Sequence, residues 1–378
     1  MSNPTNNLNA TVSLISDISA LARKWRALEE NADRSFFLSW EWVTTTLNVT
    51  TDPAYCAEVT DDTGNVIALG IFFAINERRR GVLKVRQLRL HETLSGQTKS
   101  IPAEYNELLC LSGMENAAWN AILKMLTSQN TIQWDEIVIT NGTLAIEQID
   151  IPKPLFCYRH AQSISGAVDL AALREKNTRT VDDYLSHLGK STRSQIRRSI
   201  RLYNEQGPLS LKRTTSLDEA FAKLDALAEM HEQKWRAIGQ SGLMTEEFLF
   251  AFNKALLQTG FAAGKVELVS IFSGDTPIAY LYNFVDRDNV LFYVGGFKHE
   301  DDNRLKPGLV AHALAVTDHL NSGRNIYDFM AGADRYKLNL GDRGPDMIGL
   351  TIARPRIGLL AENGLRVLKN RLQTKQRD

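Results

Sequence analysis

The chain has 378 residues, of which 43% are hydrophobic, and its 44 basic and 44 acidic side chains give a formal net charge of zero. A chain of this length is expected to form two domains rather than one, and the lack of net positive charge argues against a DNA partner. Three isolated cysteines suit neither a disulfide framework nor a metal site. No stretch approaches the ~18 apolar residues of a membrane span, so the sequence predicts a cytoplasmic protein that uses no metal.

Two tryptophans near the start of the chain are the first candidate contacts. Residues 18–30 have helical apolar spacing, and a second predicted helix begins near Ser39. Trp40 and Trp42 are two positions apart, so they cannot share one face of that helix. We expect one of them to pack in the core and the other to line a groove, which makes Trp40 a candidate substrate contact. The alternative is that both are core residues.

A strand-turn-strand pattern occurs twice in the sequence. The first copy surrounds a turn at 61–65, and the second, LVSIF and PIAYLYNFV, surrounds a turn at 273–275. Ile67-Ala68 in the first copy corresponds to Ile278-Ala279 in the second. This echo favours two similar domains. We place them at 1–170 and 184–355, with a charged linker at 171–183 and a tail at 356–378.

An irregular segment at 88–109 carries Glu104 and Tyr105. Long loops inside compact domains often carry function. These two residues are therefore candidates for a substrate pocket, and ordinary hairpin residues are the alternative.

A basic stripe follows the predicted linker. Lys190, Arg193, Arg197 and Arg201 have the spacing of one helical face. The stripe would meet phosphates, an anionic membrane or carboxylates elsewhere in the fold. A solvated stripe that is neutralised within the chain is the alternative.

The predicted helix from 217 to 238 places His231 and Trp235 on one apolar stripe. A histidine in such a position is usually a hydrogen-bonded core residue. Alternatively, His231 and Trp235 line the pocket of an acceptor, where the imidazole would take a proton from an ammonium group.

The stretch from Leu291 to Gly341 carries the clearest strand-helix-strand signal. An aromatic and β-branched strand ends at Gly295-Gly296, where a bulge or a close backbone approach is expected. Pro307-Gly308 opens a helix that closes at 321–323. A second strand at 325–330 places Asp328 among buried-looking neighbours. Such a unit predicts parallel strands.

Parallel strands of this kind place a ligand site at their carboxyl ends, beside the start of the helix. The backbone N–H groups of Gly308, Leu309 and Val310, with Arg304 and Lys306 alongside, would bind a phosphate or pyrophosphate. An ordinary crossover whose helix start faces water is the alternative.

The run RLKPGLVAHALAVTDHLNSGRNIYDFMAGADRYKLNLG resembles the acyltransferase domain of the GNAT superfamily in proteins of the cellulose- and exopolysaccharide-biosynthesis type. The matching positions are Pro307, Gly308, Asp328, Phe329, Gly332, Tyr336 and Lys337. Weaker similarity extends from Phe36 to Gly341. The resemblance implies an α/β fold of two tandem GNAT-like domains, each a central mixed sheet flanked by helices, related to Fem-type aminoacyl transferases. It also implies that acyl-CoA or acetyl-CoA binds between splayed strands, and that the region of Glu104 and Tyr105 helps to shape the acceptor pocket.

The expected reaction is attack of an amine, or less readily a hydroxyl, on a thioester. The strand end formed by Tyr293, Val294, Gly295 and Gly296 would offer backbone N–H groups to the thioester oxygen. Asp328 or His231 is the candidate base and Tyr336 or Tyr293 the candidate acid. Lys337 would stabilise the oxyanion or bind a donor phosphate.

Two alternatives stay open. An aminoacyl-tRNA donor would contact the basic stripe, and its binding would fall steeply with salt. A non-catalytic binding protein with the same fold is the other alternative, because Ala331 and Ala333 stand where the family often has charged residues and because Glu300, Asp301 and Asp302 lie close to the predicted phosphate site.

The tail is a predicted amphipathic helix rich in Lys and Arg. It would lie on an anionic bilayer at the inner membrane face and deliver the enzyme to a lipid-linked acceptor, or pack against its own domain. Beyond a small-molecule or lipid-linked acceptor, the sequence indicates neither the acceptor nor the oligomeric state.

Overall fold

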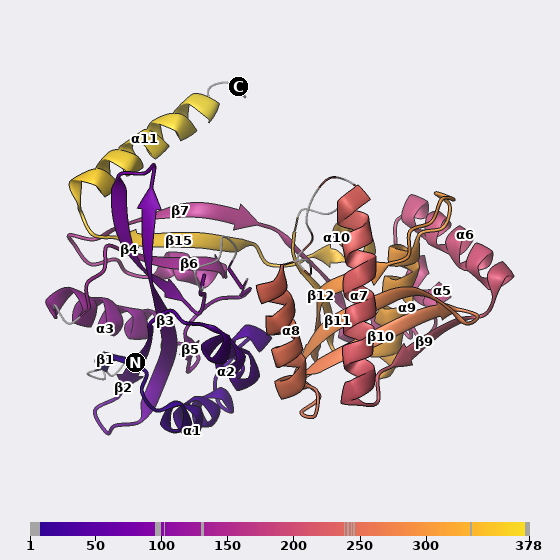
Figure 1. Ribbon diagram of the computed structural model, residues 1–378, viewed down its shortest axis with the longest axis horizontal. Helices are drawn as coiled ribbons and strands as arrows, with labels where there is room; N and C mark the ends of the chain where they lie inside the picture. Colours follow the sequence, from indigo (N-terminus) through magenta and orange to yellow (C-terminus); the bar gives the residue numbers. More distant parts are fainter. Residues whose placement is uncertain are drawn as a thin grey trace. The chain divides into compact units, whose positions relative to one another are not determined.

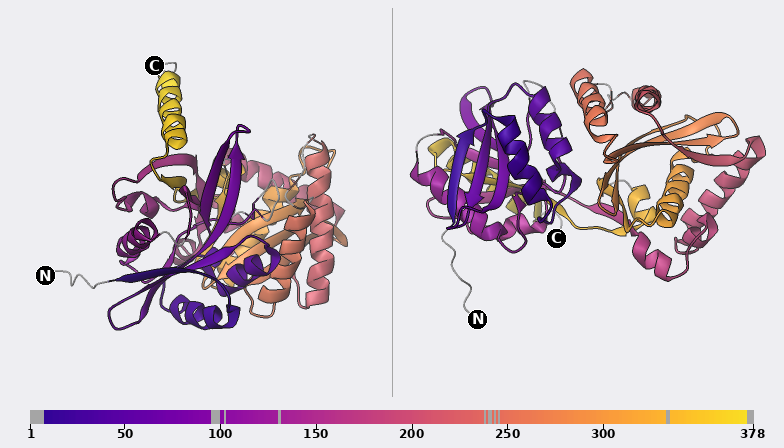
Figure 2. Two further views of the ribbon diagram at one scale, coloured as in Figure 1. Left: turned by 60° about the vertical axis from the view of Figure 1, so that its left-hand side comes forward. Right: turned by 90° about the horizontal axis from the view of Figure 1, so that it is seen from below.

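The computed structural model describes residues 8–94, 100–101, 103–129, 132–237, 239, 242, 244, 246–332 and 335–374 (Figures 1 and 2). The chain divides into two compact units. Unit 1 comprises Met1–Gln162 together with Met347–Asp378, and unit 2 comprises Ser163–Asp346. The predicted fold class is confirmed, because each unit has a mixed sheet flanked by helices.

Unit 1 contains the first half of the chain and its last strand and helix. Its elements are β1 (Asn9–Leu14), α1 (Ile18–Glu29), the 3-10 turn η1 (Phe36–Leu38), α2 (Trp40–Val49), β2 (Ala54–Thr60), β3 (Val66–Arg79), β4 (Leu83–Leu90), β5 (Leu109–Cys110), α3 (Glu115–Ser128), β6 (Glu136–Gly142), η2 (Leu144–Gln148), β7 (Phe156–Ser163), β15 (Met347–Ala353) and α11 (Ile357–Thr374). The strand order is β1-β2-β3-β4-β6-β15-β7, and β5 pairs with β3.

The two faces of the first sheet pack against different helices. Successive side chains of β3 lie on opposite faces of the sheet. Phe72 packs on the α3 side against Trp119, and Ile71 and Phe73 pack on the side of α1 and α2. Asp17 caps α1 by accepting the N–H of Ala20 (2.8 Å). Both faces of the central strand are therefore buried.

Unit 2 contains the second sheet. Its elements are β8 (Ser165–Asp169), α4 (Leu170–Glu175), α5 (Val181–Ser186), α6 (Lys190–Gln206), β9 (Leu209–Arg213), α7 (Leu217–Ala237), α8 (Glu247–Gly260), β10 (Val266–Ser273), β11 (Thr276–Asp286), β12 (Asn289–Phe297), α9 (Pro307–Asn321), β13 (Ile326–Ala331), α10 (Arg335–Leu340) and β14 (Asp342–Arg343). The strand order is β14-β8-β13-β12-β11-β10-β9. Helices α4, α5, α6 and α9 share one core with the sheet, while α7 packs on β11 and β12.

The two sheets have the same pattern of pairing. In each sheet three antiparallel pairs are followed by one parallel pair, β4 with β6 and β12 with β13, and then by an antiparallel strand. That last strand is supplied from the other half of the chain: β15 pairs with β6, and β8 pairs with β13. The units are thus two copies of one topology that exchange a strand.

This exchange moves the predicted domain boundaries. β8 lies within the predicted first domain but belongs to the second sheet, and β15 lies within the predicted second domain but belongs to the first. The predicted linker at 171–183 overlaps two helices, α4 and α5, that bury Leu173 and Tyr184 against α9. Pairing between distant segments, which no local pattern contains, sets these boundaries.

Candidate functional site

The parallel strands of unit 2 form a fork. β12 and β13 pair only from Asn289–Ile326 to Leu291–Asp328, although β12 runs on to Phe297 and β13 to Ala331. β12 also carries a bulge, because Tyr282 faces Val294 while the next residue of β11 faces Phe292. The strands therefore separate beyond Leu291, as the resemblance implied, and leave backbone groups of β12 without a neighbour in β13.

The helix α9 begins beside the end of β12. Pro307 occupies its first turn, where a missing N–H costs nothing. The N–H of Lys306 donates to Ser199 Oγ (2.8 Å). The N–H of Val310 was predicted to be exposed, but it donates to the Lys306 carbonyl in the first hydrogen bond of the helix (3.0 Å). The N–H groups of Gly308 and Leu309 have no acceptor within the helix, so they are available to an anion.

A cavity of about 420 Å3 lies at this helix start, within unit 2. It is lined by Phe297, Lys298, His299, Glu300, Asn303, Leu305, Lys306, Pro307, Gly308, Leu309, His312 and Tyr336. Four predicted site residues meet there, namely Lys306, Gly308, Leu309 and Tyr336. The cavity combines an apolar wall with two lysines, a composition that fits a ligand with an anionic end and an uncharged arm.

His312 lines the cavity and is a titratable residue that the sequence analysis did not single out. Its ring lies edge-on to Phe292 (centroids 4.5 Å apart) and Phe329 (5.2 Å), the first residues beyond the last pair of the fork. His312 Nδ1 lies 3.2 Å from the hydroxyl of Tyr327, and within the described part of the chain its Nε2 has no hydrogen-bond partner. Burial, and secondarily the charge of Lys337, lowers the pKa of His312 to about 3, so the imidazole is neutral at physiological pH.

Tyr336 stacks on this histidine from α10. The two ring centroids are 5.6 Å apart and the planes are 15° apart. The ring of Tyr336 also lies edge-on to Phe329 at 6.2 Å. The predicted acid is therefore held beside the fork.

Asp328 and Lys337 meet at a bulge in β13. Asp328 Oδ1 accepts the N–H of Met330 (2.6 Å), a residue whose φ of 62° lies in the left-handed region. Lys337, which is 7% exposed, donates from Nζ to the carbonyls of Met330 (3.3 Å) and Ala331. Two residues of β13 stand opposite one of β8 at this point. Both side chains thus stabilise a strained turn at the end of the fork, and neither is among the residues lining the cavity.

His231 and Trp235 lie on the other side of β12. His231 Nδ1 donates to the carbonyl of Gly295 (3.1 Å), and its ring centroid is 5.9 Å from that of Trp235. A Cβ on Gly296 would lie 2.6 Å from the carbonyl oxygen of Leu227 in α7. The glycine pair therefore allows the close backbone approach that the sequence predicted, but β12 continues through it rather than ending there.

The remaining β12 candidates are held by the sheet. Val294 is buried, and the ring of Tyr293 packs against Phe284 (4.6 Å) and Tyr282 (5.8 Å). Tyr293 lies in the bulge, and the structure does not bring it to the cavity lining.

Arg304 stands outside the cavity. Its guanidinium pairs with Asp302 (2.7 Å), which holds the pKa of Arg304 above its usual range. Lys306 is the predicted cation that lines the cavity, and Glu300 there is paired with Lys298 (2.9 Å). The carboxylates near the helix start are thus largely neutralised by their neighbours.

The three other substrate candidates belong to unit 1. Trp40 is 5% exposed and packs against Trp25 in the core. Trp42 is also buried in the core, where it packs against Phe36. Glu104 and Tyr105 are half-buried, and the carbonyl of Tyr105 accepts the hydroxyl of Ser35 (3.5 Å). Their assignment to substrate stays a prediction.

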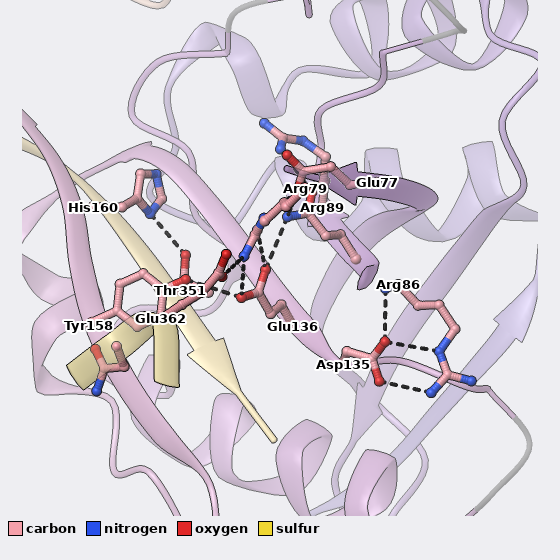
Figure 3. A network of polar contacts seen from close by, with 12 residues as sticks. Glu77, Arg79, Arg86, Arg89, Asp135, Glu136, Tyr158, His160, Thr351 and Glu362 are labelled. Atoms are coloured by element: carbon pink, nitrogen blue, oxygen red, sulfur yellow. Dashed lines mark hydrogen bonds and ion pairs between the residues drawn. The ribbon is translucent and has the colours of Figure 1, made fainter. Parts of the chain in front are cut away.

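Unit 1 has a larger cavity of its own, about 610 Å3, over the polar face of its sheet. Figure 3 shows the network of polar contacts among residues of this region. Arg79 forms a bidentate pair with the buried Glu136 and also contacts Glu77 and Glu362. Tyr158 donates to the same Glu136 carboxylate (3.1 Å). Of the three consecutive arginines at 78–80, the middle one thus lies in an internal network.

The helix of unit 1 that corresponds to α9 does not offer a comparable anion site. α3 follows β5 and precedes the parallel strand β6, but its first turn carries Glu115, whose carboxylate accepts the N–H of Gly113 (3.0 Å). Glu107 is close by, and the cavity they share is only about 90 Å3. Two carboxylates at a helix start disfavour a bound phosphate.

The described residues contain neither a metal cluster nor a membrane-spanning helix. No group of three or more His, Cys, Asp or Glu side chains there is placed to hold a metal ion. None of the helices in the same residues is both long enough and apolar enough to span a bilayer.

Comparison with known proteins places the fold. Residues 190–338 match the family model described as an acetyltransferase (GNAT) domain. No curated protein matches the chain. The matched region includes β12, α9, β13 and most of α10, so the fork and its cavity lie within the part of the chain that is similar to this family.

Solved structures share this fold over most of the chain. FemX is similar with a TM-score of 0.55 at 10% identity, covering 89% of this chain and 96% of that one. L-PGS from Bacillus licheniformis gives 0.53 at 10% identity, with 93% and 95% covered. The C-terminal domain of a putative lysylphosphatidylglycerol synthetase from Agrobacterium fabrum gives 0.51 at 10% identity, with 92% and 96% covered. At such identities the likeness concerns the fold alone.

Proposed function

We propose that the chain is an acyltransferase that moves an acyl group from acyl-CoA to an amine of a small or lipid-linked acceptor, with the donor bound in the cavity of unit 2. One observation carries this proposal: the parallel strands separate where His312, Tyr336 and the start of α9 surround a cavity of about 420 Å3. An uncharged arm would pass into the fork while its phosphates stay at the helix start.

The donor's phosphates are assigned to the first turn of α9. The N–H groups of Gly308 and Leu309 and the ammonium of Lys306 would contact them. A Cβ on Gly308 would meet only the ring of Phe297, at 3.6 Å. The helix start is thus open on the cavity side, and a phosphate can approach its backbone.

The thioester oxygen is assigned to His312. Tyr327 is fully buried, and burial raises the pKa of its phenol well above the usual value, so the hydroxyl keeps its proton. Among the described residues the hydroxyl forms its hydrogen bond with His312 Nδ1, so donation to Nδ1 gives this buried proton an acceptor. Nδ1 then accepts, Nε2 carries the imidazole proton, and a neutral donor faces the developing oxyanion.

The reaction balances as an ordinary aminolysis. The acceptor nitrogen forms a bond to the thioester carbon, the carbonyl oxygen becomes an oxyanion and re-forms the carbonyl, and the C–S bond breaks. Before the attack, the ammonium gives up one proton to a base and becomes a neutral amine. The thiolate takes a proton from the hydroxyl of Tyr336, and the second proton lost by the nitrogen as the amide forms restores the Tyr336 hydroxyl. A pKa of about 3 makes His312 unsuited to that task, so Asp328 and His231 stay the predicted candidates.

A matched pair of variants tests donor binding. Calorimetry with CoA should show Lys306→Ala binding at least about tenfold more weakly than wild type, since one phosphate contact is lost. Arg304→Ala should bind within about twofold, because Arg304 is paired with Asp302 outside the cavity. Equal affinities in all three proteins would remove the helix start from the donor site.

The second candidate is transfer from aminoacyl-tRNA. It is favoured by the likeness to FemX and by the exposed arginines of α6, where Arg198 and Arg201 face solvent and Arg197 pairs with Asp182 (3.0 Å). Thiol release from acetyl-CoA in the presence of an amine supports the first candidate. Turnover that requires charged tRNA, with binding that falls steeply in salt, supports the second.

A further inference from the structure

The C-terminal helix α11 has two opposite faces. Leu359, Glu362 and Arg366 are spaced three and four residues apart and turn toward unit 1. Leu359 is 3% exposed and packs on Val85 and Leu83, and Glu362 reaches Arg79 (3.2 Å). This face therefore packs against the rest of unit 1.

The other face of α11 is apolar and exposed. The described large hydrophobic side chains that are exposed are Leu14, Ile18, Val82, Leu338, Ile357, Leu360, Leu365, Val367 and Leu368. Most of them belong to α11, and Val82, at 85% exposure, lies at the tip of the β3–β4 hairpin. Single exposed apolar residues are normal on a protein surface, but a cluster of them usually marks an interaction surface.

The hairpin tip and the helix lie side by side (Figure 1). A Cβ on Gly358 would lie 2.8 Å from Leu83 Cδ1, and Arg356 donates to the carbonyl of Lys84 (3.4 Å). We call the exposed residues of these two elements the tail surface: Val82 with Arg78, Arg80 and Lys84 from the hairpin, and Ile357, Leu360, Val367 and Leu368 from α11.

Charge distinguishes the occupants that could cover this surface. The hairpin tip presents three exposed basic side chains, Arg78, Arg80 and Lys84, and residues 78–84 contain no acidic residue, whereas Arg79 turns inward. Residues 356–378 contain six basic and two acidic residues, of which Glu362 and Arg366 turn toward unit 1 and Arg356 pairs with Asp135. In a symmetric dimer the same patch would meet itself, so these cations would face one another. An anionic lipid surface receives both the apolar side chains and the cations.

We propose that the tail surface binds anionic membranes peripherally, with the outer face of α11 and Val82 entering the headgroup region. This proposal is independent of the reaction assigned to unit 2. It requires no membrane-spanning helix, because the apolar stripe lies parallel to the bilayer.

Flotation of the full chain with vesicles tests it. The wild type should float with equimolar phosphatidylcholine and phosphatidylglycerol vesicles, much less with phosphatidylcholine alone, and less as salt rises. Leu360→Asp with Leu368→Asp should lower the vesicle-bound fraction at least about tenfold. Arg80→Glu with Lys84→Glu should lower it at least about 25-fold, since each of the two lost cations contributes roughly one fivefold step.

The matched control carries Leu14→Asp and Ile18→Asp, exposed residues of unit 1 outside the tail surface, and should float like wild type. Thermal unfolding of each variant confirms its fold. Wild type that stays in solution with anionic vesicles, or a Leu360→Asp, Leu368→Asp variant that floats equally well, overturns the proposal. So does light scattering that shows a wild-type dimer which these two substitutions dissociate.

Discussion

The imidazole of His312 lies parallel to the phenol of Tyr336, with ring centroids 5.6 Å apart and planes 15° apart. The two residues come from α9 and α10, and both line the cavity beyond the fork of β12 and β13. The stack places a neutral hydrogen-bond donor next to a hydroxyl that can release a proton. In the proposed reaction the first would meet the thioester oxygen and the second the leaving sulfur.

His312→Phe tests the donor role. The phenylalanine ring keeps the aromatic packing but removes Nε2–H, so kcat should fall about 10²-fold or more while KM for acyl-CoA changes little. Tyr327→Phe should cause a smaller loss, because it removes the hydroxyl that fixes the tautomer without removing the donor. A His312→Phe enzyme within threefold of wild-type kcat would exclude His312 from the reaction.

Two buried histidines predict sensitivity to mild acid. Burial lowers the pKa of His91 to about 4, against a smaller opposing effect of Asn106, and lowers that of His312 to about 3. Unfolded histidine titrates near 6.5. Between these values the unfolded chain binds more protons, so stability is complete above about pH 6.5 and falls on acidification, by up to about 1.4 kcal/mol per pH unit per histidine.

Urea unfolding at pH 7.5, 6 and 5 measures this effect. His91→Gln should flatten the dependence of the free energy of unfolding, because a glutamine can still contact Asn106 but does not titrate. An unchanged slope in the variant would show that His91 is not neutral and buried in solution.

Asp328→Asn separates two functions of that carboxylate. The amide oxygen can still accept the N–H of Met330, so a carboxylate that only stabilises the bulge predicts wild-type stability and turnover within a few fold. Asp328→Ala, which leaves that N–H without its acceptor, should cost about 1–3 kcal/mol of stability. A loss of more than about 100-fold in kcat for Asp328→Asn, with stability retained, would instead identify the carboxylate as the base.

Removal of Arg79 should destabilise unit 1 strongly. Glu136 is fully buried, and Arg79→Leu would leave its carboxylate with Gln87 (3.1 Å) and Tyr158 as donors among the described residues. The expected loss is about 3–5 kcal/mol at pH 7. The control is Arg159→Leu, whose partner Glu147 is partly exposed, with an expected loss below about 1 kcal/mol. Equal unfolding midpoints for the two variants would contradict the assignment of a buried pair.

Local sequence signals account for the core of the site. Pro307 predicted the start of α9, and the polar turn that follows the helix predicted its end. The aromatic run before Gly295 predicted β12. The parallel pairing followed from the length of that unit. Each of these features depends on residues that are close in the sequence.

Features that depend on pairing between distant segments could not be predicted from the local sequence. Nothing local to β15 indicates that it joins β6 instead of the second sheet. His312 lies among alanines and a valine on a helix that is apolar on nearly all sides, so it resembled a packing residue. The contacts of the His312 ring with Phe292 and Phe329 at the fork distinguish this histidine from an ordinary packing residue. A histidine within two turns of a helix start in a strand-helix-strand unit was the available signal.

Nuclear magnetic resonance of the chain with nitrogen-labelled histidine tests the central claim most directly. A CoA analogue in which a ketone replaces the thioester should shift the Nε2–H signal of His312 on saturation, assigned by its loss in His312→Phe, while the ring stays in the neutral Nε2–H form. No shift at His312 on saturation with the analogue, or a charged His312 ring at neutral pH, would contradict the account of the fork as the place where an acyl donor is held.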